Sequence, residues 1–121
     1  MNILFVDDDR QVINAIKRNF RDTIWKIDSA LSGPEALIKI DEGDYDVIVA
    51  DMAMPAMSGD RLLKEVQALD PSITRVILSG HADQSLKLDD ADLVHRWLDK
   101  PCDAAYLMEV LQEIERERRL L

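Results

Sequence analysis

Acidic side chains follow two short apolar runs of the sequence. Asp7 and Asp8 come directly after Ile3–Val6, and Asp51 comes directly after Val47–Ala50. Two carboxylates about 4 Å apart repel each other by about 4 kcal/mol at an effective dielectric constant of roughly 20. If the fold brings these aspartates together, their cluster must hold a cation or a proton. Carboxylates suit Mg²⁺, which keeps several waters and bridges to phosphate, and Mn²⁺ accepts the same kind of ligand.

A hydroxyl group and an ammonium group follow two later apolar runs. Ser79 comes directly after Val76–Leu78, and Lys100 follows Val94–Leu98 after one intervening residue. A hydroxyl donates to an anionic oxygen, and lysine supplies a compact positive charge. A carboxylate can be the nucleophile in phosphoryl transfer, which demands mainly positioning and charge neutralisation. These residue types therefore predict a site for a phosphoryl group attached to one of the carboxylates.

Five short apolar or alternating segments, spread over the whole chain, predict β-strands. Apolar residues at helical spacing predict a helix after each of the first three strands and after the last one. Strands that alternate with helices form a parallel sheet covered on both faces, and right-handed crossovers restrict its strand order. We expect a doubly wound, flavodoxin-like α/β fold with strand order 2-1-3-4-5. The predicted strands are Ile3–Val6, Trp25–Asp28, Val47–Ala50, Val76–Leu78 and Val94–Leu98.

This strand order gathers the acidic residues at one point of the sheet. Sites in such sheets form beyond the carboxyl ends of the strands, where the winding direction reverses. Strands one and three are neighbours at that point, so we expect Asp7, Asp8 and Asp51 to converge there.

Local signals predict where several helices begin and end. Ser32 is a candidate N-cap for a helix that has Pro34 in its first turn. Asp70 precedes a proline, which is expected to end the third helix. The last helix is expected to begin at about residue 103. Residues 82–92 carry no regular helical stripe, so we expect a short or distorted helix there.

The composition fits one soluble globular domain over residues 1–121. Lys and Arg number 15 against 24 Asp and Glu, and the formal charge of -9 argues against direct binding to nucleic acid or to an anionic membrane. No apolar run approaches the roughly 20 residues that span a bilayer. A single cysteine, Cys102, excludes an intrachain disulfide and fits a reducing compartment. We therefore expect a cytoplasmic protein.

Four motifs closely resemble the receiver domain family of bacterial response regulators, and the resemblance covers essentially the whole chain. Each motif is weak alone, but all occur in the family's order and each lies at the end of a predicted strand. The resemblance implies a phosphorylation switch of two-component signalling and phosphorelays, in which a sensor kinase's phosphohistidine or a phosphotransfer protein donates the phosphate. The motifs are Ile3–Asp9, Asp51–Pro55 with Gly59, Val76–Gly80 and Trp97–Pro101.

The resemblance implies a role for each acidic residue. Asp51 would be the phosphoacceptor and also a Mg²⁺ ligand. Asp8 would be the more direct metal ligand of the acidic pair, and Asp7 would act largely through water. The backbone carbonyl of Ala53 would complete the protein ligands. Such a receiver catalyses its own phosphorylation and dephosphorylation, and it is not a conventional turnover enzyme.

The resemblance also implies that Ser79 and Lys100 contact the phosphoryl oxygens and that the Lys100–Pro101 bond is cis. Ser79 and Trp97 would form the switch. Trp97 stands where Tyr or Phe is common, and because indole keeps only a donor, both packing and switching remain open for it. His81 lies two residues beyond Ser79, and we favour an exposed loop residue over a group that acts on the phosphate.

Two other classes of protein match part of the pattern. Asp7 and Asp9 have the Asp-x-Asp spacing of a small phosphohydrolase of the haloacid-dehalogenase type, with Asp7 as nucleophile. Gln11 occupies the place where threonine or valine usually follows that motif. A flavin-binding domain shares the expected architecture, but the aspartates after the first strand would repel a flavin phosphate. We prefer the receiver interpretation.

The end of the last predicted helix bears on the partners. Glu113–Leu121 alternates charges and ends in two leucines, so this helix either frays or continues into an output domain, and we favour continuation. The expected partners are a sensor histidine kinase or phosphotransfer protein, and an output domain after Leu121 or on a separate protein. A phosphorylation-dependent homodimer is a further expectation.

Overall fold

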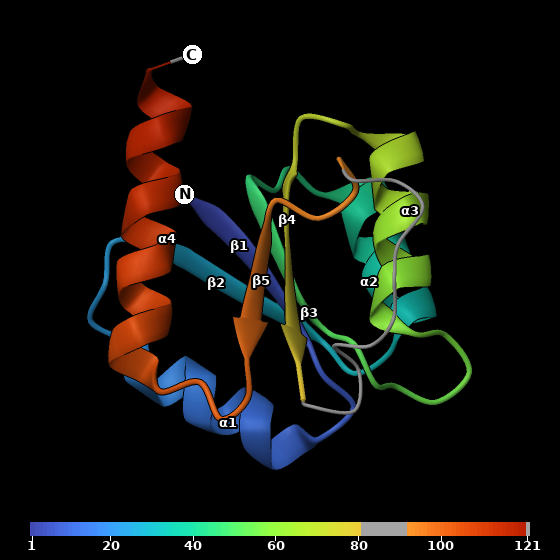
Figure 1. Cartoon of the computed structure of the whole chain (residues 1–121), viewed down its shortest axis with the longest axis horizontal. Helices are drawn as coiled ribbons and strands as arrows, with labels where there is room; N and C mark the ends of the chain where they lie inside the picture. The colour runs from blue at the N-terminus through green and yellow to red at the C-terminus, as the bar shows by residue number, and fades with distance from the viewer. Residues whose placement is uncertain (81–91, 121) are drawn as a thin grey trace.

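A five-stranded parallel sheet with helices on both faces forms the frame of the molecule in the computed structural model, which describes residues 1–80 and 92–120 (Figure 1). The strands are β1 (Asn2–Val6), β2 (Lys26–Ala30), β3 (Val47–Asp51), β4 (Thr74–Ser79) and β5 (Arg96–Asp99). The helices in the described ranges are α1 (Arg10–Asn19), α2 (Gly33–Glu42), α3 (Gly59–Leu69) and α4 (Ala104–Arg119). The strand order is β2-β1-β3-β4-β5, which confirms the prediction.

The sheet is covered on both faces because alternate residues of each strand point to opposite sides. Helices α1 and α4 lie on one side, and α2 and α3 lie on the other (Figure 1). In β1, Ile3 and Phe5 belong to the core beneath α1 and α4, whereas Leu4 and Val6 belong to the core beneath α2 and α3. The central strand β3 is buried along its whole length, as expected for a strand between two layers of helices.

Side-chain caps set the beginnings of three helices. The Asp9 carboxylate accepts from the backbone N of Gln11 before α1, and the Asp103 carboxylate accepts from the backbone N of Tyr106 before α4. Ser32 caps α2 as predicted, since its hydroxyl accepts from the backbone N of the third helical residue at 3.2 Å. The predicted ends are also confirmed: α3 ends just before Asp70, and α4 begins immediately after its cap.

The second strand begins one residue later than the sequence predicted and extends further. We expected Trp25–Asp28, and β2 comprises Lys26–Ala30. Trp25 is buried, and its Nε1 donates to a carboxylate oxygen of Glu115 on α4 at 3.0 Å. This side chain therefore packs beneath α4, and strand pairing starts at the following residue, opposite Asn2.

The fifth strand also begins later than predicted, because a buried side chain takes the backbone carbonyls before it. We expected Val94–Leu98, and β5 comprises Arg96–Asp99. Arg75 on β4 is buried, and its guanidinium binds these carbonyls. Its Nε donates to the carbonyl of Leu93 at 2.7 Å, and its Nη2 donates to the carbonyl of Asp92 at 3.1 Å. Those carbonyls accept from a side chain on β4.

Two expectations fall on residues that the structure leaves out. The helix expected over 82–92 lies outside the described residues except for its last position, and His81 lies outside them as well.

The bond between Lys100 and Pro101 is cis, as the resemblance implied. Within residues 1–80 and 92–120, no helix has the length and apolar character needed to cross a membrane.

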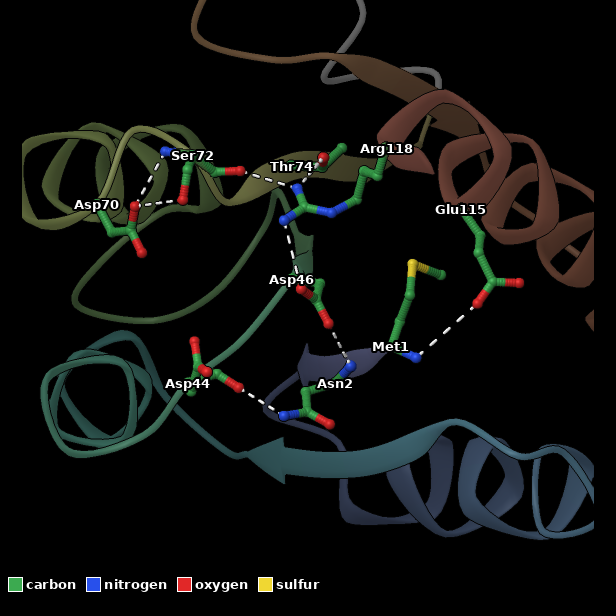
Figure 2. Close-up of polar contacts among 9 residues, drawn as sticks. All are labelled: Met1, Asn2, Asp44, Asp46, Asp70, Ser72, Thr74, Glu115 and Arg118. Atoms are coloured by element: carbon green, nitrogen blue, oxygen red, sulfur yellow. Dashed lines mark hydrogen bonds and ion pairs between the residues drawn. The ribbon is translucent and has the colours of Figure 1, made fainter. Parts of the chain in front are cut away.

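Arg118, in the last turn of α4, binds to the amino-terminal ends of the central strands (Figure 2). Its guanidinium donates to the carbonyl of Ser72 at 2.8 Å, to Thr74 Oγ1 at 3.0 Å and to Asp46 Oδ1 at 3.3 Å. The second oxygen of Asp46 accepts from the backbone N of Asn2 at 2.7 Å. We call this set of residues the amino-terminal network. Its carboxylate faces a cation and a backbone donor, so its charge is compensated within the chain.

Candidate phosphoacceptor site

Three carboxylates converge at the carboxyl ends of β1 and β3. One oxygen each from Asp7, Asp8 and Asp51 lies within 4.8 Å of the other two. Asp7 and Asp51 are both 5% exposed, whereas Asp8 is exposed. The two strands are hydrogen-bonded neighbours, with Val6 paired to Ala50, and this pairing places the acidic residues together as the strand order predicted.

The position of Asp7 makes its charge costly. Burial raises the pKa of Asp7 above its ordinary value, and the nearby charge of Asp51 raises it further. The backbone amide of Asp9 and the charge of Lys100 oppose this rise. That amide donates to Asp7 Oδ1 at 2.9 Å. The cluster therefore carries more negative charge than its surroundings compensate, which is the condition in which a cation binds favourably.

Lys100 faces the cluster from the end of β5. Its Nζ donates to Asp51 Oδ1 at 2.7 Å, and the backbone N of Ala53 lies 3.3 Å from the same oxygen. The backbone N of Lys100 donates to the carbonyl of Ser79 at 2.8 Å, so the ends of β4 and β5 are joined here. The lysine side chain remains 39% exposed, which leaves its ammonium accessible to an incoming anion.

Ser79 supplies the hydroxyl that the sequence predicted. It is 1% exposed, and its Oγ has no hydrogen-bond partner among the described residues. The register pairs Asp51 with Leu78, so Ser79 lies one residue beyond the strand neighbour of the acidic residue. A buried hydroxyl without a partner costs about 1–3 kcal/mol. A phosphoryl oxygen on the neighbouring carboxylate would accept its proton, so the residues present fit a phosphorylated aspartate with its cation.

The loop after β3 is closed by backbone contacts at its base. The backbone N of Met52 donates to the carbonyl of Leu78 at 2.9 Å, and the backbone N of Gly59 donates to the carbonyl of Met52 at 2.9 Å. A Cβ on Gly59 would lie 2.5 Å from the carbonyl oxygen of Asp51. Only glycine allows this close approach, so the start of α3 packs directly against the backbone of the acidic residue. Ala53 lies exposed in this loop.

The structure gives the remaining residues of interest surroundings of their own. Trp97 on β5 is 40% exposed and belongs to neither core cluster of the described residues. Its role as a switch stays a prediction. Cys102 is half-buried and packs against the core beneath α1 and α4. His95 lies at the surface, and its Nδ1 accepts from the backbone N of Arg75 at 2.9 Å.

Sequence reasoning missed Arg75, which orders the segment that leads to the lysine-bearing strand. Besides its bonds to the carbonyls before β5, its Nη1 donates to the carbonyl of Ile73 at 3.0 Å. The one available signal was an arginine directly before the apolar run Val76–Leu78, at a position that a strand buried on both faces fills with an apolar residue.

These features define a class of protein: a doubly wound domain that acts as a phosphoacceptor switch. A family model described as "Response regulator receiver domain" matches residues 3–112, and the chain belongs to this family of two-component signalling proteins. Neither the phosphohydrolase nor the flavin-binding interpretation is favoured by this match, and the chain is not a conventional enzyme.

Relatives and solved structures agree with the family. The chain is 26% identical over 121 residues to the C4-dicarboxylate transport transcriptional regulatory protein DctD of Rhizobium meliloti, covering 99% of this chain and 26% of that protein. The chain spans between 12% and 32% of the length of the first curated relatives that it matches.

Two solved structures show the same fold. The adenylate cyclase from Rhodopirellula baltica superposes with a TM-score of 0.91 at 30% identity, covering 98% of this chain and 90% of that one. The response regulator protein TrrA from Thermotoga maritima, in complex with Mg²⁺-BeF, superposes with a TM-score of 0.79 at 25% identity, covering 93% of this chain and 97% of that one. The observed sheet and its strand order are therefore those of receiver domains.

Proposed function

We propose that Asp51 accepts a phosphoryl group, in a Mg²⁺-dependent transfer from the phosphohistidine of a sensor kinase or of a phosphotransfer protein. The observation that carries this proposal is the set of groups around the Asp51 carboxylate. Asp51 is hydrogen-bonded to Lys100, and its carboxylate lies within 4.8 Å of two further carboxylates. It pairs with Leu78 on β4, and the next residue, Ser79, has a buried hydroxyl without a hydrogen-bond partner among the described residues. A surplus of negative charge, a lysine ammonium and a hydroxyl donor surround this one side chain.

The acidic residues suit a hard divalent cation. Asp7, Asp8, Asp51 and the carbonyl of Ala53 would hold Mg²⁺ or, in its place, Mn²⁺. When bound, the metal ion supplies positive charge that offsets both the carboxylate repulsion and the charge of the phosphoryl oxygens. The TrrA structure in complex with Mg²⁺-BeF supports this assignment by similarity.

The chain's own residues have separate tasks in the transfer. A carboxylate oxygen of Asp51 forms the new bond to phosphorus, while the bond from phosphorus to the donor's imidazole nitrogen breaks and its electron pair stays on that nitrogen. Lys100 already lies 2.7 Å from Oδ1 and neutralises charge that develops on the phosphoryl oxygens. Ser79 donates its hydroxyl proton to one of these oxygens in a hydrogen bond. Hydrolysis of the resulting acyl phosphate by water returns the domain to its resting state, and Ala53 places no bulky side chain beside that carboxylate.

Phosphorylation changes a surface through the junction of β4 and β5. Ser79 and Lys100 share a backbone hydrogen bond, so a shift of the hydroxyl toward the phosphate is passed to the lysine and its strand. Trp97 lies on that strand, exposed to solvent, and would follow the shift. An output domain or a separate partner reads the altered surface, and its preference for one state must amount to several kcal/mol for a complete switch.

The same proposal covers the setting of the domain. Residues 1–121 form one receiver domain whose last helix leads toward an output domain, as in relatives that are several times longer. We place the exchange in the cytoplasm, together with a phosphorylation-dependent homodimer as a way in which the new surface is used.

Intact-mass analysis with acetyl phosphate and MgCl₂ tests the proposal. The wild-type chain should gain the mass of one phosphoryl group, and peptide mapping should place it on Asp51. Asp51→Asn should abolish the gain, whereas Asp41→Asn, an exposed aspartate on α2, should not. A phosphoryl group found on Asp7 would instead support the phosphohydrolase interpretation.

A further inference from the structure

The loop Met52–Ser58 carries Ala53, and its conformation decides where the carbonyl of that residue lies. Hydrogen bonds from the backbone N of Met52 and to the carbonyl of the same residue fix only the base of the loop. Further along, Ala53 and Pro55 are exposed, and Ala56 has a left-handed φ of 67°. Side chains must therefore hold the more distant part of the loop against the domain.

Two methionines provide that attachment. Met54 and Met57 are partly buried and pack against the core cluster beneath α2 and α3, the two helices that lie side by side on one face (Figure 1). Methionine fills irregular gaps because its unbranched side chain adapts to the space available. Of the two, Met57 packs against a backbone position, Gly33, that has no side chain.

Met57 lies directly against Gly33, the first residue of α2. A Cβ built on Gly33 would lie 2.5 Å from Met57 Sδ and 3.0 Å from both its Cβ and its Cγ. The glycine is buried, and its φ is not positive. The position therefore requires the absence of a side chain and not the backbone freedom of glycine, because the stem of Met57 occupies the space where a Cβ would stand.

We propose that Met57, seated against Gly33, is a positioning residue for the metal-binding loop, and this inference rests on the proposed function. The contact attaches the loop to α2, so Ala53 lies in chain order between Met52, which is hydrogen-bonded at the base, and Met57, which is packed against Gly33. Because the backbone N of Ala53 lies 3.3 Å from Asp51 Oδ1, a displaced loop disturbs both the carbonyl ligand and the acidic side chain. Groups behind the ligands typically change metal affinity by about 10–100-fold when they are altered.

A double-mutant cycle on the full chain tests the contact. Gly33→Ala should raise the MgCl₂ concentration at half-saturation by about tenfold, measured by calorimetric titration, because the new methyl group displaces Met57. Met57→Ala should weaken binding less, because it frees the loop without pushing it. In the double variant the added methyl has room, so Gly33→Ala should have little further effect on Met57→Ala. Met54→Ala is the matched control: it removes a similar side chain from the same loop, and its effect should add to that of Gly33→Ala.

A second measurement on the metal-free protein separates this inference from the proposed function. The amide ¹H–¹⁵N signal of Ala53 should shift in Gly33→Ala and return toward the Met57→Ala position in the double variant. If the wild-type chain fails to bind Mg²⁺, the proposed function is wrong, and the amide signal still judges the contact. The inference is overturned if Gly33→Ala, folded by its urea transition, leaves both the Mg²⁺ half-saturation and the Ala53 signal unchanged. Should Gly33→Ala not fold, an unchanged half-saturation and Ala53 signal in Met57→Ala would overturn it equally.

Discussion

The two ends of the sheet treat their acidic residues in opposite ways. At the amino-terminal end, Asp46 meets the guanidinium of Arg118 and the backbone N of Asn2 (Figure 2). At the carboxyl end, Asp7 shares its surroundings with two more carboxylates, and burial together with the charge of Asp51 raises its pKa. At the amino-terminal end, the aspartate charge is paired in contacts that hold α4 to the strands. At the carboxyl end, negative charge is left in excess.

This difference indicates how a stable frame and a reactive site coexist in a small domain. Compensated charges add to stability, whereas a cluster of uncompensated charges lowers it and gains its value only when a ligand binds. The amino-terminal network lies at the ends of the strands away from the acidic cluster, so it can hold α4 in place without touching the chemistry. Variants at the two ends should therefore separate stability from phosphorylation.

The largest expected difference is in the phosphorylation rate, between variants of the basic residues Lys100 and Arg118. Lys100→Ala should lower the initial rate of Asp51 phosphorylation by acetyl phosphate by about 10²-fold or more, because one charge-stabilising donor is lost at the reacting group. Arg118→Ala should leave this rate within about twofold of the wild-type rate, since its guanidinium binds only at the amino-terminal end. Time-resolved intact-mass analysis measures both rates. Equal losses of rate in the two variants would show that the two ends of the sheet do not have separate roles.

The next effect is on stability and has the reverse order. Arg118→Ala should lower the free energy of unfolding by about 1–2 kcal/mol, because it removes hydrogen bonds to Ser72, Thr74 and Asp46 from a side chain that is about one quarter exposed. Lys100→Ala should change it by less than about 1 kcal/mol, because the lysine side chain is 39% exposed and water screens its ion pair. Urea unfolding in magnesium-free buffer measures the two values.

The two aspartates should respond to amide substitution with opposite signs. Asp7→Asn should raise the free energy of unfolding by about 1 kcal/mol in magnesium-free buffer, because it removes repulsion within the acidic cluster, and it should weaken Mg²⁺ binding. Asp46→Asn should lower stability by about 1 kcal/mol and leave Mg²⁺ binding unchanged. Urea unfolding and calorimetry on the same preparations test both statements; a loss of stability in Asp7→Asn would contradict the account given for the carboxyl end.

The smallest effect concerns pH. Burial, followed by the charges of Arg75 and Arg96, lowers the pKa of His95, whose Nδ1 accepts a backbone hydrogen bond and must be unprotonated to do so. The unfolded chain therefore binds more protons than the folded one as the pH falls through the ordinary histidine value of about 6.5. Stability should fall by a few tenths of a kcal/mol, on the order of what an exposed group contributes, between pH 7.5 and about 5.5. His95→Gln should show a flatter dependence in urea unfolding over the same range; an equally steep one would assign the loss to other groups.

The sequence was informative where the signal is local. Apolar runs that end in Asp7, Asp51 and Ser79 predicted the strands, and the alternation of strands with helices predicted their order. The convergence of the acidic residues follows from that order alone, because neighbouring parallel strands bring their carboxyl ends together. The position of the acidic cluster was therefore predictable from the sequence alone.

Contacts between distant residues were not predictable in this way. Arg118 and Asp46 are 72 positions apart, and nothing in the sequence around either one distinguishes it from the other charged residues. The late start of β5 depends on the buried guanidinium of Arg75, which competes for carbonyls that a strand would otherwise use. Likewise, position 33 needs glycine because Met57 packs against it, and the sequence does not show that these two residues are in contact.

The unequal exposure of the two tryptophans gives the molecule a built-in optical probe. Trp25 is 8% exposed and hydrogen-bonded to Glu115, whereas Trp97 is 40% exposed on the strand that leads to the lysine. A collisional quencher such as acrylamide reaches the second indole far more readily than the first. The emission that acrylamide removes therefore reports on β5, and the emission that survives reports on the core beneath α4. Stopped-flow fluorescence of the unlabelled chain can thus follow the strand while phosphate is added and lost.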